Sequence, residues 1–261
     1  MITGASSGIG KCTAVYLAAR GYQVYGTSRH PESCQEIKNG CMINMDVRDT
    51  GSVKKAIAHV VKKEGHIDIL VNNAGVGIGC AVEDTSTEMA QALFDTNFFG
   101  ICRVLQEVLP VMRRQSKGLI INMSSIGGII GLPYQGIYSA SKFAVEGLSE
   151  ALYKELSLSA INVVLIEPGD FKTEFTANRQ TIKTNHHAEQ FQRTMTVIEK
   201  DEQAGQPPLK IAHLIEKIIN TPNPRLRYAV GAPDQKFSLF LKKILPNRWF
   251  DQIIMSYYQL K

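Results

Sequence analysis

Tyr138, Lys142 and Ser125, which lies thirteen residues before the tyrosine, have types and spacing that suit proton transfer. In a helix, Tyr138 and Lys142 would lie on one face with their Cβ atoms about 6 Å apart. An ammonium about 4 Å from a phenolate contributes roughly 4 kcal/mol at an effective dielectric constant of about 20. That energy would bring a tyrosine pKa from about 10 to about 7, where the side chain can serve as a general acid or base. The same spacing also occurs on ordinary half-exposed helix faces, so other parts of the chain must decide between a catalytic pair and a plain helix surface.

The elements that would position these residues alternate along the chain. Short apolar, β-branched runs alternate with longer amphipathic stretches, which is typical of βα units around a parallel sheet covered on both faces. We predict one α/β domain over residues 1–261, with a doubly wound, Rossmann-like sheet of about seven strands flanked by helices. The predicted strands are Gln23–Thr27, Met42–Met45, Ile69–Asn72, Leu119–Met123, Asn162–Ile166 and Tyr228–Val230. The predicted helices are Ile9–Arg20, Thr50–Glu64, Glu88–Arg114, Tyr138–Leu158 and Leu209–Asn220.

Two stretches depart from this alternation. Residues 174–208 are polar and weakly helical, and an excursion of that length in a compact domain is usually a lid or a disordered segment. We expect a lid over the substrate. Residues 237–260 carry apolar side chains at helical spacing among lysines and an arginine. This pattern favours packing on the body of the protein or on a partner over binding at a membrane surface.

Composition excludes several classes of protein. The 261 residues are 44% hydrophobic and 20% charged, as in soluble globular proteins. The net charge of +5 is mild, and no run of basic residues interleaved with aromatics suggests a nucleic-acid partner. Five scattered cysteines predict neither a disulfide framework nor a zinc site and favour a cytoplasmic location. No window approaches the roughly 20 apolar residues that a membrane span requires.

The segment Thr3-Gly4-Ala-Ser-Ser-Gly8-Ile-Gly10 leads directly into a predicted helix. Glycines let the backbone turn tightly and approach a pyrophosphate closely, and a helix N-terminus offers free N–H groups. We therefore expect a dinucleotide cradle here. The expected contacts are Gly4, Ser6, Ser7, Gly8, Ile9 and Gly10.

Ser28 and Arg29 follow the predicted strand Gln23–Thr27, where an acidic residue would receive the ribose of NAD. A hydroxyl and a guanidinium suit a 2′-phosphate instead. We predict NADP(H) as the cofactor. The alternative is that Arg29 is a solvated surface residue without a role in binding.

Taken together, these motifs resemble those of the short-chain dehydrogenase/reductase family over nearly the whole chain. The matching motifs are Thr3-Gly4-x-x-x-Gly8-x-Gly10, Asp46-Val47, Asn72-Asn73-Ala74-Gly75, Asn97, Ser125, Tyr138-x-x-x-Lys142 and Pro168-Gly169. Each motif is modest, but their shared order and spacing are specific. The resemblance implies an oxidoreductase that transfers a hydride between a nicotinamide and a ketone or secondary alcohol.

The resemblance also implies roles for individual residues. Tyr138 would exchange a proton with the substrate oxygen, and Ser125 would orient that oxygen. Lys142 would lower the tyrosine pKa and hold the nicotinamide ribose, and Asn97 would hold a water that links Lys142 to solvent. Without the family, we would interpret Asn97 as a buried polar residue with its hydrogen bonds satisfied.

The remaining cofactor contacts follow from the same resemblance. Asp46 and Val47 would face the adenine, and Asn73, Ala74 and Gly75 would pack behind the cofactor. Those expected at the nicotinamide are Pro168, Gly169, Phe171 and Thr173, with Thr173 at its carboxamide. Hydride transfer requires no metal, and none is predicted. Family members commonly pair two long helices across a two-fold axis, so we expect a homodimer or homotetramer.

The start of the chain departs from the family pattern. Members have a complete first strand before the glycine turn, whereas this sequence has only Met1 and Ile2 there. Because strands typically span about five or six residues, several central ladder hydrogen bonds would be missing. We expect the natural polypeptide to begin upstream of Met1, which the intact mass of the natively expressed protein would test.

Residues 126–137, between Ser125 and Tyr138, are apolar except for Gln135. Such a wall favours an apolar ketone or alcohol over a sugar or a charged acid. The resemblance is closest to members that act on steroids and retinoids. Two alternatives stay open: a reductase of 3-ketoacyl thioesters, and a catalytically idle NADP(H)-binding sensor on the same fold.

Overall fold

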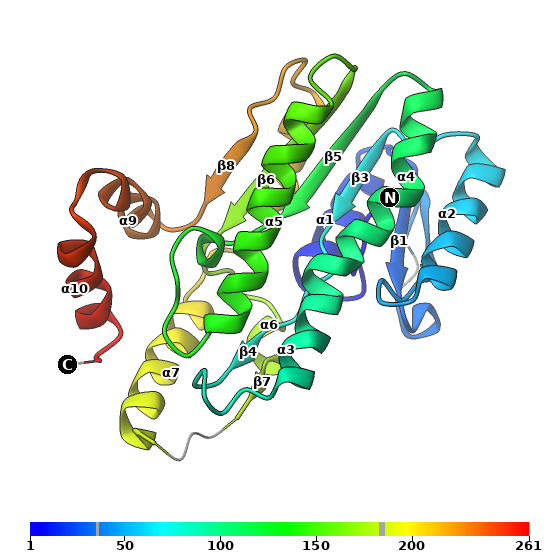
Figure 1. The fold of residues 1–261 in the computed structure, drawn as a ribbon. Coiled ribbons are helices and arrows are strands. Elements are labelled where there is room, and N and C mark those ends of the chain that lie inside the picture. Colours follow the sequence, from blue (N-terminus) through cyan, green and yellow to red (C-terminus); the bar gives the residue numbers. More distant parts are fainter. Residues whose placement is uncertain (35–36, 183–185, 261) are drawn as a thin grey trace.

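The computed structural model describes residues 1–34, 37–182 and 186–260, and a parallel sheet runs through its centre (Figure 1). Its strand order is β2–β1–Ile2–β3–β5–β6–β8, with Ile2 bridging β1 and β3. The bounds are Val24–Ser28 for β1, Gly40–Asn44 for β2, Ile69–Asn72 for β3, Gly118–Met123 for β5, Ile161–Pro168 for β6 and Arg227–Val230 for β8. All six predicted strands are present, and the doubly wound α/β class is confirmed.

Ile2 occupies the centre of the sheet almost alone. Its N–H donates to the Tyr25 carbonyl at 2.9 Å, and its own carbonyl accepts from Thr27 N–H at 2.9 Å. On the other side, Thr3 N–H donates to the Val71 carbonyl at 2.9 Å. The Ile2 side chain is only 2% exposed. Residues 1–3 therefore join the two halves of the sheet, with Met1 accepting from Val71 N–H at 2.9 Å, where the family pattern suggested a full strand.

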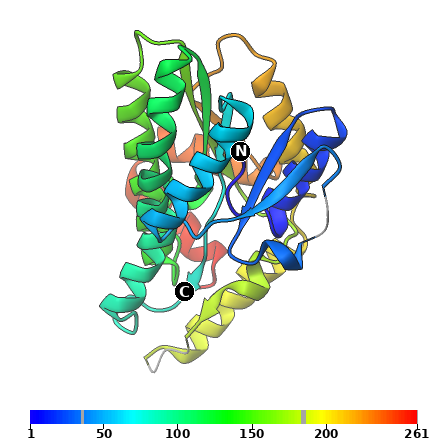
Figure 2. The ribbon, with the colours of Figure 1, turned by 90° about the vertical axis from the view of Figure 1, so that its right-hand side faces the viewer.

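Helices cover both faces of the sheet, with α2, α4 and α5 on one face and α1 and α8 on the other (Figures 1 and 2). Their bounds are Gly8–Ala19 for α1, Thr50–Glu64 for α2, Gly100–Arg114 for α4, Gly136–Glu155 for α5 and Leu209–Ile219 for α8. Each face has its own apolar core: Val104 and Val145 lie in the first, and Leu17 and Ile215 in the second. The sheet is thus buried on both sides, as its β-branched strands predicted.

The long helix predicted at Glu88–Arg114 is instead divided. Helix α3 spans Thr87–Phe94, a π-helical turn spans Asp95–Phe99, and α4 follows. Arg103 holds the turn by donating to the Asp95 carboxylate at 2.6 Å and to the Asp95 carbonyl at 3.3 Å. Sequence periodicity did not reveal this widened turn, which carries the buried Asn97. Such turns are frequent at functional sites.

Residues 174–208 form more regular structure than their polar sequence indicated. Helix α6 spans Phe175–Asn178, strand β7 at Gln180–Thr181 pairs with β4 at Ile78–Gly79, and α7 spans Ala188–Gln203. Residues 183–185 of the expected lid lie outside the described residues. Helix α7 lies beyond the carboxyl ends of the strands (Figure 1). The prediction of weak helicity was wrong because Phe191, Met195 and Ile198 form one buried stripe along α7.

The C-terminal stretch forms α9 at Pro233–Ile244 and α10 at Asn247–Tyr257, beside the β8 edge of the sheet (Figure 1). Leu239 and Phe250 are buried against Ile130, which confirms packing on the body. Short 3-10 turns complete the chain at Pro31–Ser33 and Ile126–Gly128. Among the helices of the described residues, none is both long and apolar enough to cross a membrane.

Candidate active site

Tyr138 and Lys142 lie on α5, whose first turn faces the carboxyl end of β5. They are 8% and 5% exposed, and the Lys142 Nζ lies 5.8 Å from the centre of the Tyr138 ring. The ammonium also donates to the Met123 carbonyl, the last of β5, at 3.0 Å. The predicted helical placement of the pair on one face is confirmed.

Ser125 reaches the same place from the turn after β5. Its hydroxyl accepts from Gly127 N–H at 3.0 Å and lies 3.5 Å from the Pro168 carbonyl oxygen. A hydrogen bond from Ser125 also acts on the Tyr138 phenol. A Cβ at Gly127 would lie 3.3 Å from the tyrosine ring, so a small residue is required beside it. The structure therefore brings all three residues of the candidate chemistry together.

The electrostatics of this group differ from the sequence-based expectation. Burial raises the pKa of Tyr138 to about 12, and the hydrogen bond from Ser125 opposes that shift. Burial also lowers the pKa of Lys142 to about 8, with the nearby Glu146 acting in the opposite direction. The expected drop of the tyrosine pKa towards 7 is wrong for the protein alone, because both groups are desolvated.

Asn97 lies in the π-helical turn and is fully buried. Its Oδ1 accepts from Val76 N–H at 2.8 Å, and its Nδ2 donates to the Val76 carbonyl at 3.0 Å and to Ser141 Oγ at 3.1 Å. The amide thus fastens the loop after β3 to α5. A Cβ on Gly75, in that loop, would lie 3.6 Å from Lys142 Nζ. The water link through Asn97 stays a prediction.

The glycine turn is locked to the end of β3. Thr3 Oγ1 accepts from the N–H groups of Asn73 and Ala74, both at 2.9 Å. The Asn73 Nδ2 donates to the Thr3 and Gly4 carbonyls at 3.0 Å. A Cβ at Gly10 would collide with the Gly4 carbonyl and the Asn73 amide. Two motifs that are far apart in the sequence are therefore joined by hydrogen bonds in the fold.

The turn offers its N–H groups at the start of α1. Gly4 and Gly8 have positive φ angles of 64° and 53°, which glycine adopts most readily. Gly8 N–H donates to a carboxylate oxygen of Glu174 at 2.9 Å, and Thr173 packs 3.4 Å from a Cβ at Gly8. An anion at this helix N-terminus is the arrangement that a dinucleotide phosphate requires. Ser6, Ser7 and Ile9 lie in the same turn.

The expected ribose end lies after β1. Ser28 closes that strand, and Arg29 is exposed beyond it, with its carbonyl accepting from Asn44 at 2.8 Å. Hydrogen bonds from Arg48 hold the pKa of Asp46 below its ordinary value, and the charge of Arg29 contributes to the lowering. Val47, next to Asp46, is buried. Arg48 was missed by the sequence analysis, although it follows the Asp46-Val47 motif directly.

The residues expected at the nicotinamide follow β6. Pro168 ends the strand, and Gly169 N–H donates to the Val230 carbonyl at 2.7 Å. Phe171 is 6% exposed, and Thr173 accepts from Phe175 N–H at 3.2 Å. These residues therefore lead from the sheet into the lid. Among the described residues, no cluster of three or more potential metal ligands occurs.

Sequence reasoning missed the charged residues around Tyr138. Asp170, Arg179 and Glu202 all act electrostatically on its phenol. Burial, together with Glu202 and Asp201, raises the pKa of Asp170 to about 7. Its place directly after Pro168-Gly169 could have revealed Asp170. Arg179 and Glu202 belong to no motif and converge only through the fold.

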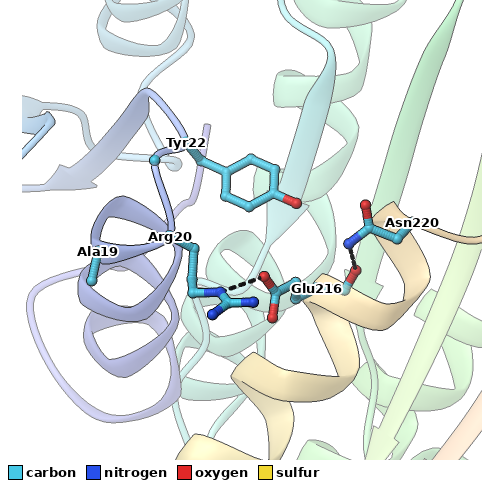
Figure 3. A pocket seen from close by; sticks show the side chains of 6 residues that line it. Ala19, Arg20, Tyr22, Glu216 and Asn220 are labelled. Atoms are coloured by element: carbon cyan, nitrogen blue, oxygen red, sulfur yellow. Dashed lines mark hydrogen bonds and ion pairs between the residues drawn. The ribbon is translucent and has the colours of Figure 1, made fainter.

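A separate surface pocket of about 660 Å³ lies near the end of α1 (Figure 3). It surrounds the ion pair between Arg20 and Glu216, whose atoms are 2.9 Å apart. The pocket is lined by Ala19, Arg20, Gly21, Tyr22, Glu216 and Asn220. It shares no residue with the predicted site.

The chain belongs to the short-chain dehydrogenase family, whose model matches residues 1–184. It is similar to the 3-ketodihydrosphingosine reductase of Bacteroides thetaiotaomicron, with 43% identity over 100% of this chain and 98% of that protein. The estradiol 17-beta-dehydrogenase 1 of Rattus norvegicus is 36% identical over 87% of this chain and 72% of its own length. A short-chain dehydrogenase from Streptomyces avermitilis superposes with a TM-score of 0.84 at 32% identity, covering 93% and 91% of the two chains. The protein is therefore an oxidoreductase of this family.

Proposed function

We propose that this protein is an NADP(H)-dependent reductase of bulky, largely apolar ketones. The observation that carries the proposal is the convergence of Ser125, Tyr138 and Lys142 beside the locked glycine turn. The glycine turn presents N–H donors at a helix N-terminus, and the one at Gly8 already binds a carboxylate, as it would bind a dinucleotide phosphate. When bound, the dinucleotide supplies the hydride that adds to the carbonyl carbon.

The chain's own residues supply the proton and the orientation. The phenolic O–H of Tyr138 donates its proton to the carbonyl oxygen as that carbon gains the hydride, and the reverse reaction returns it. Ser125 Oγ–H donates a hydrogen bond to the same oxygen and aligns it. A tyrosine with a pKa of about 12 is protonated at neutral pH, which suits the reductive direction. Lys142 holds the ribose, and Asn97 fixes the loop beside it.

The remaining cofactor roles belong to the same proposal. Ser28 and Arg29 bind the 2′-phosphate and give the preference for NADP(H) over NAD(H), and Asp46 and Val47 face the adenine. The nicotinamide rests against the segment that begins at Pro168, with Thr173 at its carboxamide. Residues 174–208 close over the substrate.

The leading substrate is a ketone of the 3-ketodihydrosphingosine type, the compound in the name of the relative with 43% identity. An apolar wall supports it, because Ile126, Ile129 and Leu132 join Leu239 and Phe250 in one cluster beside Ser125. A hydroxysteroid is the second candidate, favoured by the similarity to the rat enzyme over 87% of this chain. A 3-ketoacyl thioester fits the same wall but is named by neither of these relatives.

An oligomer is part of the proposal. Three aromatic side chains are between 44% and 49% exposed: Phe99, the last residue of the π-helical turn before α4, and Phe143 and Tyr153 on α5. A second copy of the chain packed on these helices would cover them. Elution as a monomer at micromolar concentration would contradict this arrangement.

NADPH oxidation with a panel of long-chain 3-ketones, steroid ketones and 3-ketoacyl thioesters tests the function. We expect turnover of at least one apolar ketone and a loss of about 10²- to 10⁴-fold in kcat for Tyr138→Phe, the usual range for removing a general acid. Fluorescence titration should show that the variant still binds NADPH. Binding of NADPH without turnover of any panel member would favour the idle sensor instead.

A further inference from the structure

A charged cluster lies under the lid, outside the residues assigned to the reaction so far. Arg179, at the end of α6, forms an ion pair with Glu202 on α7. Their side chains are only 1% and 11% exposed. Thr176 donates to the same Glu202 oxygen at 2.6 Å. Two buried charges from separate segments are thereby held in a fixed position.

Asp170 joins this cluster from the end of β6. Its N–H donates to the Gln235 side-chain oxygen at 3.2 Å, and the Gln235 amide donates to its carboxylate. Because Gln235 lies on α9, the C-terminal helices fix the orientation of this carboxylate. The proximity of Asp201 and Glu202 contributes to the raised pKa of Asp170.

The cluster adjoins the reacting centre. Tyr138 is influenced by the charges of Asp170, Arg179 and Glu202, and its ring centre lies 5.8 Å from that of Phe175, which begins α6. The aliphatic part of Arg179 runs along β4, where a Cβ at Gly79 would lie 3.3 Å from its Cδ. A group attached next to a carbonyl at Tyr138 would therefore meet these charges.

The cluster has hydrogen-bonding capacity that the protein does not use. The Nε and Nη1 groups of Arg179 are buried and have no hydrogen-bond partner within the part of the chain that the structure describes. Leaving a buried donor unsatisfied costs about 1–3 kcal/mol, and more for a charged group. Among the described residues, Asp170, Asp201 and Glu202 outnumber the guanidinium of Arg179 in this cluster. Asp201 accepts from the Tyr257 hydroxyl at 2.6 Å, whereas the carboxylate of Asp170 accepts from Gln235 and forms no ion pair with any of the described residues.

We propose that Asp170, Glu202 and Arg179 form a head-group site for ketones that carry an ammonium and a hydroxyl beside the carbonyl. The ammonium lies against Asp170 and Glu202, and the hydroxyl oxygen accepts from the unused N–H groups of Arg179. This assignment rests on the proposed reductase function and specifies its substrate as an amino-alcohol ketone. The hydrocarbon chain of such a lipid extends along the apolar wall at Ile129 and Leu132.

Charge and hydrogen bonding both favour this head group over an uncharged ketone. An ammonium compensates the excess negative charge, and the hydroxyl satisfies the donors of Arg179. A ketone without these groups leaves the donors unpaired. Sites built to bind a polar substrate group reject analogues that lack it far more strongly than apolar pockets discriminate by size.

Three ketones of equal chain length test the assignment: a 2-amino-1-hydroxy-3-ketone, its N-acetyl derivative and the plain 3-ketone. We expect the unmutated protein to prefer the amino ketone by at least about tenfold in kcat/KM. Asp170→Asn and Glu202→Gln should each lower kcat/KM for the amino ketone by about 10- to 100-fold, the usual loss for one partner of a buried charge pair. The plain ketone should change by less than about threefold.

Asp251→Asn, on the exposed face of α10, is the matched control and should leave kcat/KM unchanged for both the amino ketone and the plain ketone. Equal losses on the amino and plain ketones in both variants would overturn the head-group site, because a purely structural role reduces both alike. A preference of the unmutated protein for the N-acetyl derivative would overturn it as well. Turnover of the plain ketone alone would keep the reductase function and reject the head-group site. Absence of turnover with all three ketones and with every ketone of the wider panel would reject both.

Discussion

At the glycine turn, hydrogen bonds join backbone groups to two short side chains, whereas around Asp170 they join long side chains from separate segments. Thr3 and Asn73 fix the turn through five hydrogen bonds of 2.9–3.0 Å, one of which runs from Thr3 N–H to the Val71 carbonyl. On the substrate side, Arg179 donates to the carboxylate of Glu202, and the Gln235 amide donates to the carboxylate of Asp170. The proposed site thus has a cofactor half at the glycine turn and a substrate half around Asp170, Arg179 and Glu202. The two halves are built from different interactions.

This difference determines how each half responds to change. The cofactor half depends on close approach of the backbone, so an added methyl group is its most damaging alteration. The substrate half depends on buried charge, so protonation and charge removal affect it most. Variants that add a methyl group at the glycine turn or remove a charge elsewhere separate these two responses.

Gly10→Ala should have the largest effect. Its Cβ would collide with the Gly4 carbonyl and the Asn73 amide, and neither can move without breaking the lock on β3. We expect a loss of about 3 kcal/mol in the free energy of unfolding, the upper range for overpacking, together with loss of NADPH binding. Urea denaturation and fluorescence titration measure the two effects. A variant with unchanged stability and affinity would show that the turn is pliable.

Glu167, on β6 three residues before Asp170, should make the stability depend on pH. Burial and the nearby Glu146 raise the pKa of Glu167 from 4.5 to about 7, against the opposing charge of Arg227. A raised carboxyl pKa gives stability that is complete below about pH 4.5 and is lost as the pH rises through about 7. We expect Glu167 to lower the free energy of unfolding by up to about 3 kcal/mol between pH 4.5 and pH 8.

Denaturation of Glu167→Gln at several pH values checks this expectation, because the variant should lose that part of the pH dependence. An unchanged pH profile would contradict it. Asp46 in the cofactor half has the opposite sign, since its pKa is lowered by the hydrogen bonds from Arg48. Its contribution is present above its ordinary pKa of 3.8 and is lost as the pH falls through the lower folded value.

Arg29→Ala should weaken NADPH binding by about tenfold, as expected for one charge-assisted contact to a phosphate, and leave NADH binding unchanged. Arg113→Ala removes an exposed guanidinium from the end of α4 and is the control for net charge. Isothermal titration with both dinucleotides gives the comparison. Equal affinity of Arg29→Ala and the parent for NADPH would remove the basis for the predicted preference.

Gly147→Ala should give the smallest effect and has the opposite sign. A Cβ at this exposed position of α5 meets nothing within 4 Å. We expect a gain of about 1 kcal/mol in the free energy of unfolding from the helix propensity of alanine. Thermal denaturation measures it. A loss of stability would show that this face of α5 is covered in solution, for example by a second copy of the chain.

The sequence predicted the cofactor half better than the substrate half, for a physical reason. Glycines and short polar residues act through the backbone near them, so local motifs identified Gly4, Gly10 and Asn73. The bounds of α2 and β3 were also predicted correctly, since α2 is capped by Asp49, which accepts from Ser52 N–H at 2.6 Å. Such local motifs involve few neighbouring residues, so they can be recognised in the sequence without knowledge of the fold.

The substrate half depends on side chains that meet only after folding. Arg179 and Glu202 are separated by 23 positions, and no periodicity predicts that they form an ion pair. The π-helical turn at Asn97 and the helical content of α7 were missed for the same reason. The tyrosine pKa was predicted with the wrong direction because the argument included a neighbouring charge and omitted the desolvation of both groups.

The hydrogen bond between Gly8 N–H and the Glu174 carboxylate ties the first residue before α6 to the start of α1. A carboxylate and a phosphate carry the same charge, and one N–H cannot serve both well. A dinucleotide phosphate bound at this donor, as we propose, would displace Glu174 and release the start of α6. By thermodynamic linkage, interactions that stabilise the contact between Glu174 and Gly8 weaken dinucleotide binding by the same free energy. We expect an ordered sequence in which the dinucleotide enters first and the ketone second, so that one short hydrogen bond sets the order in which the two substrates load.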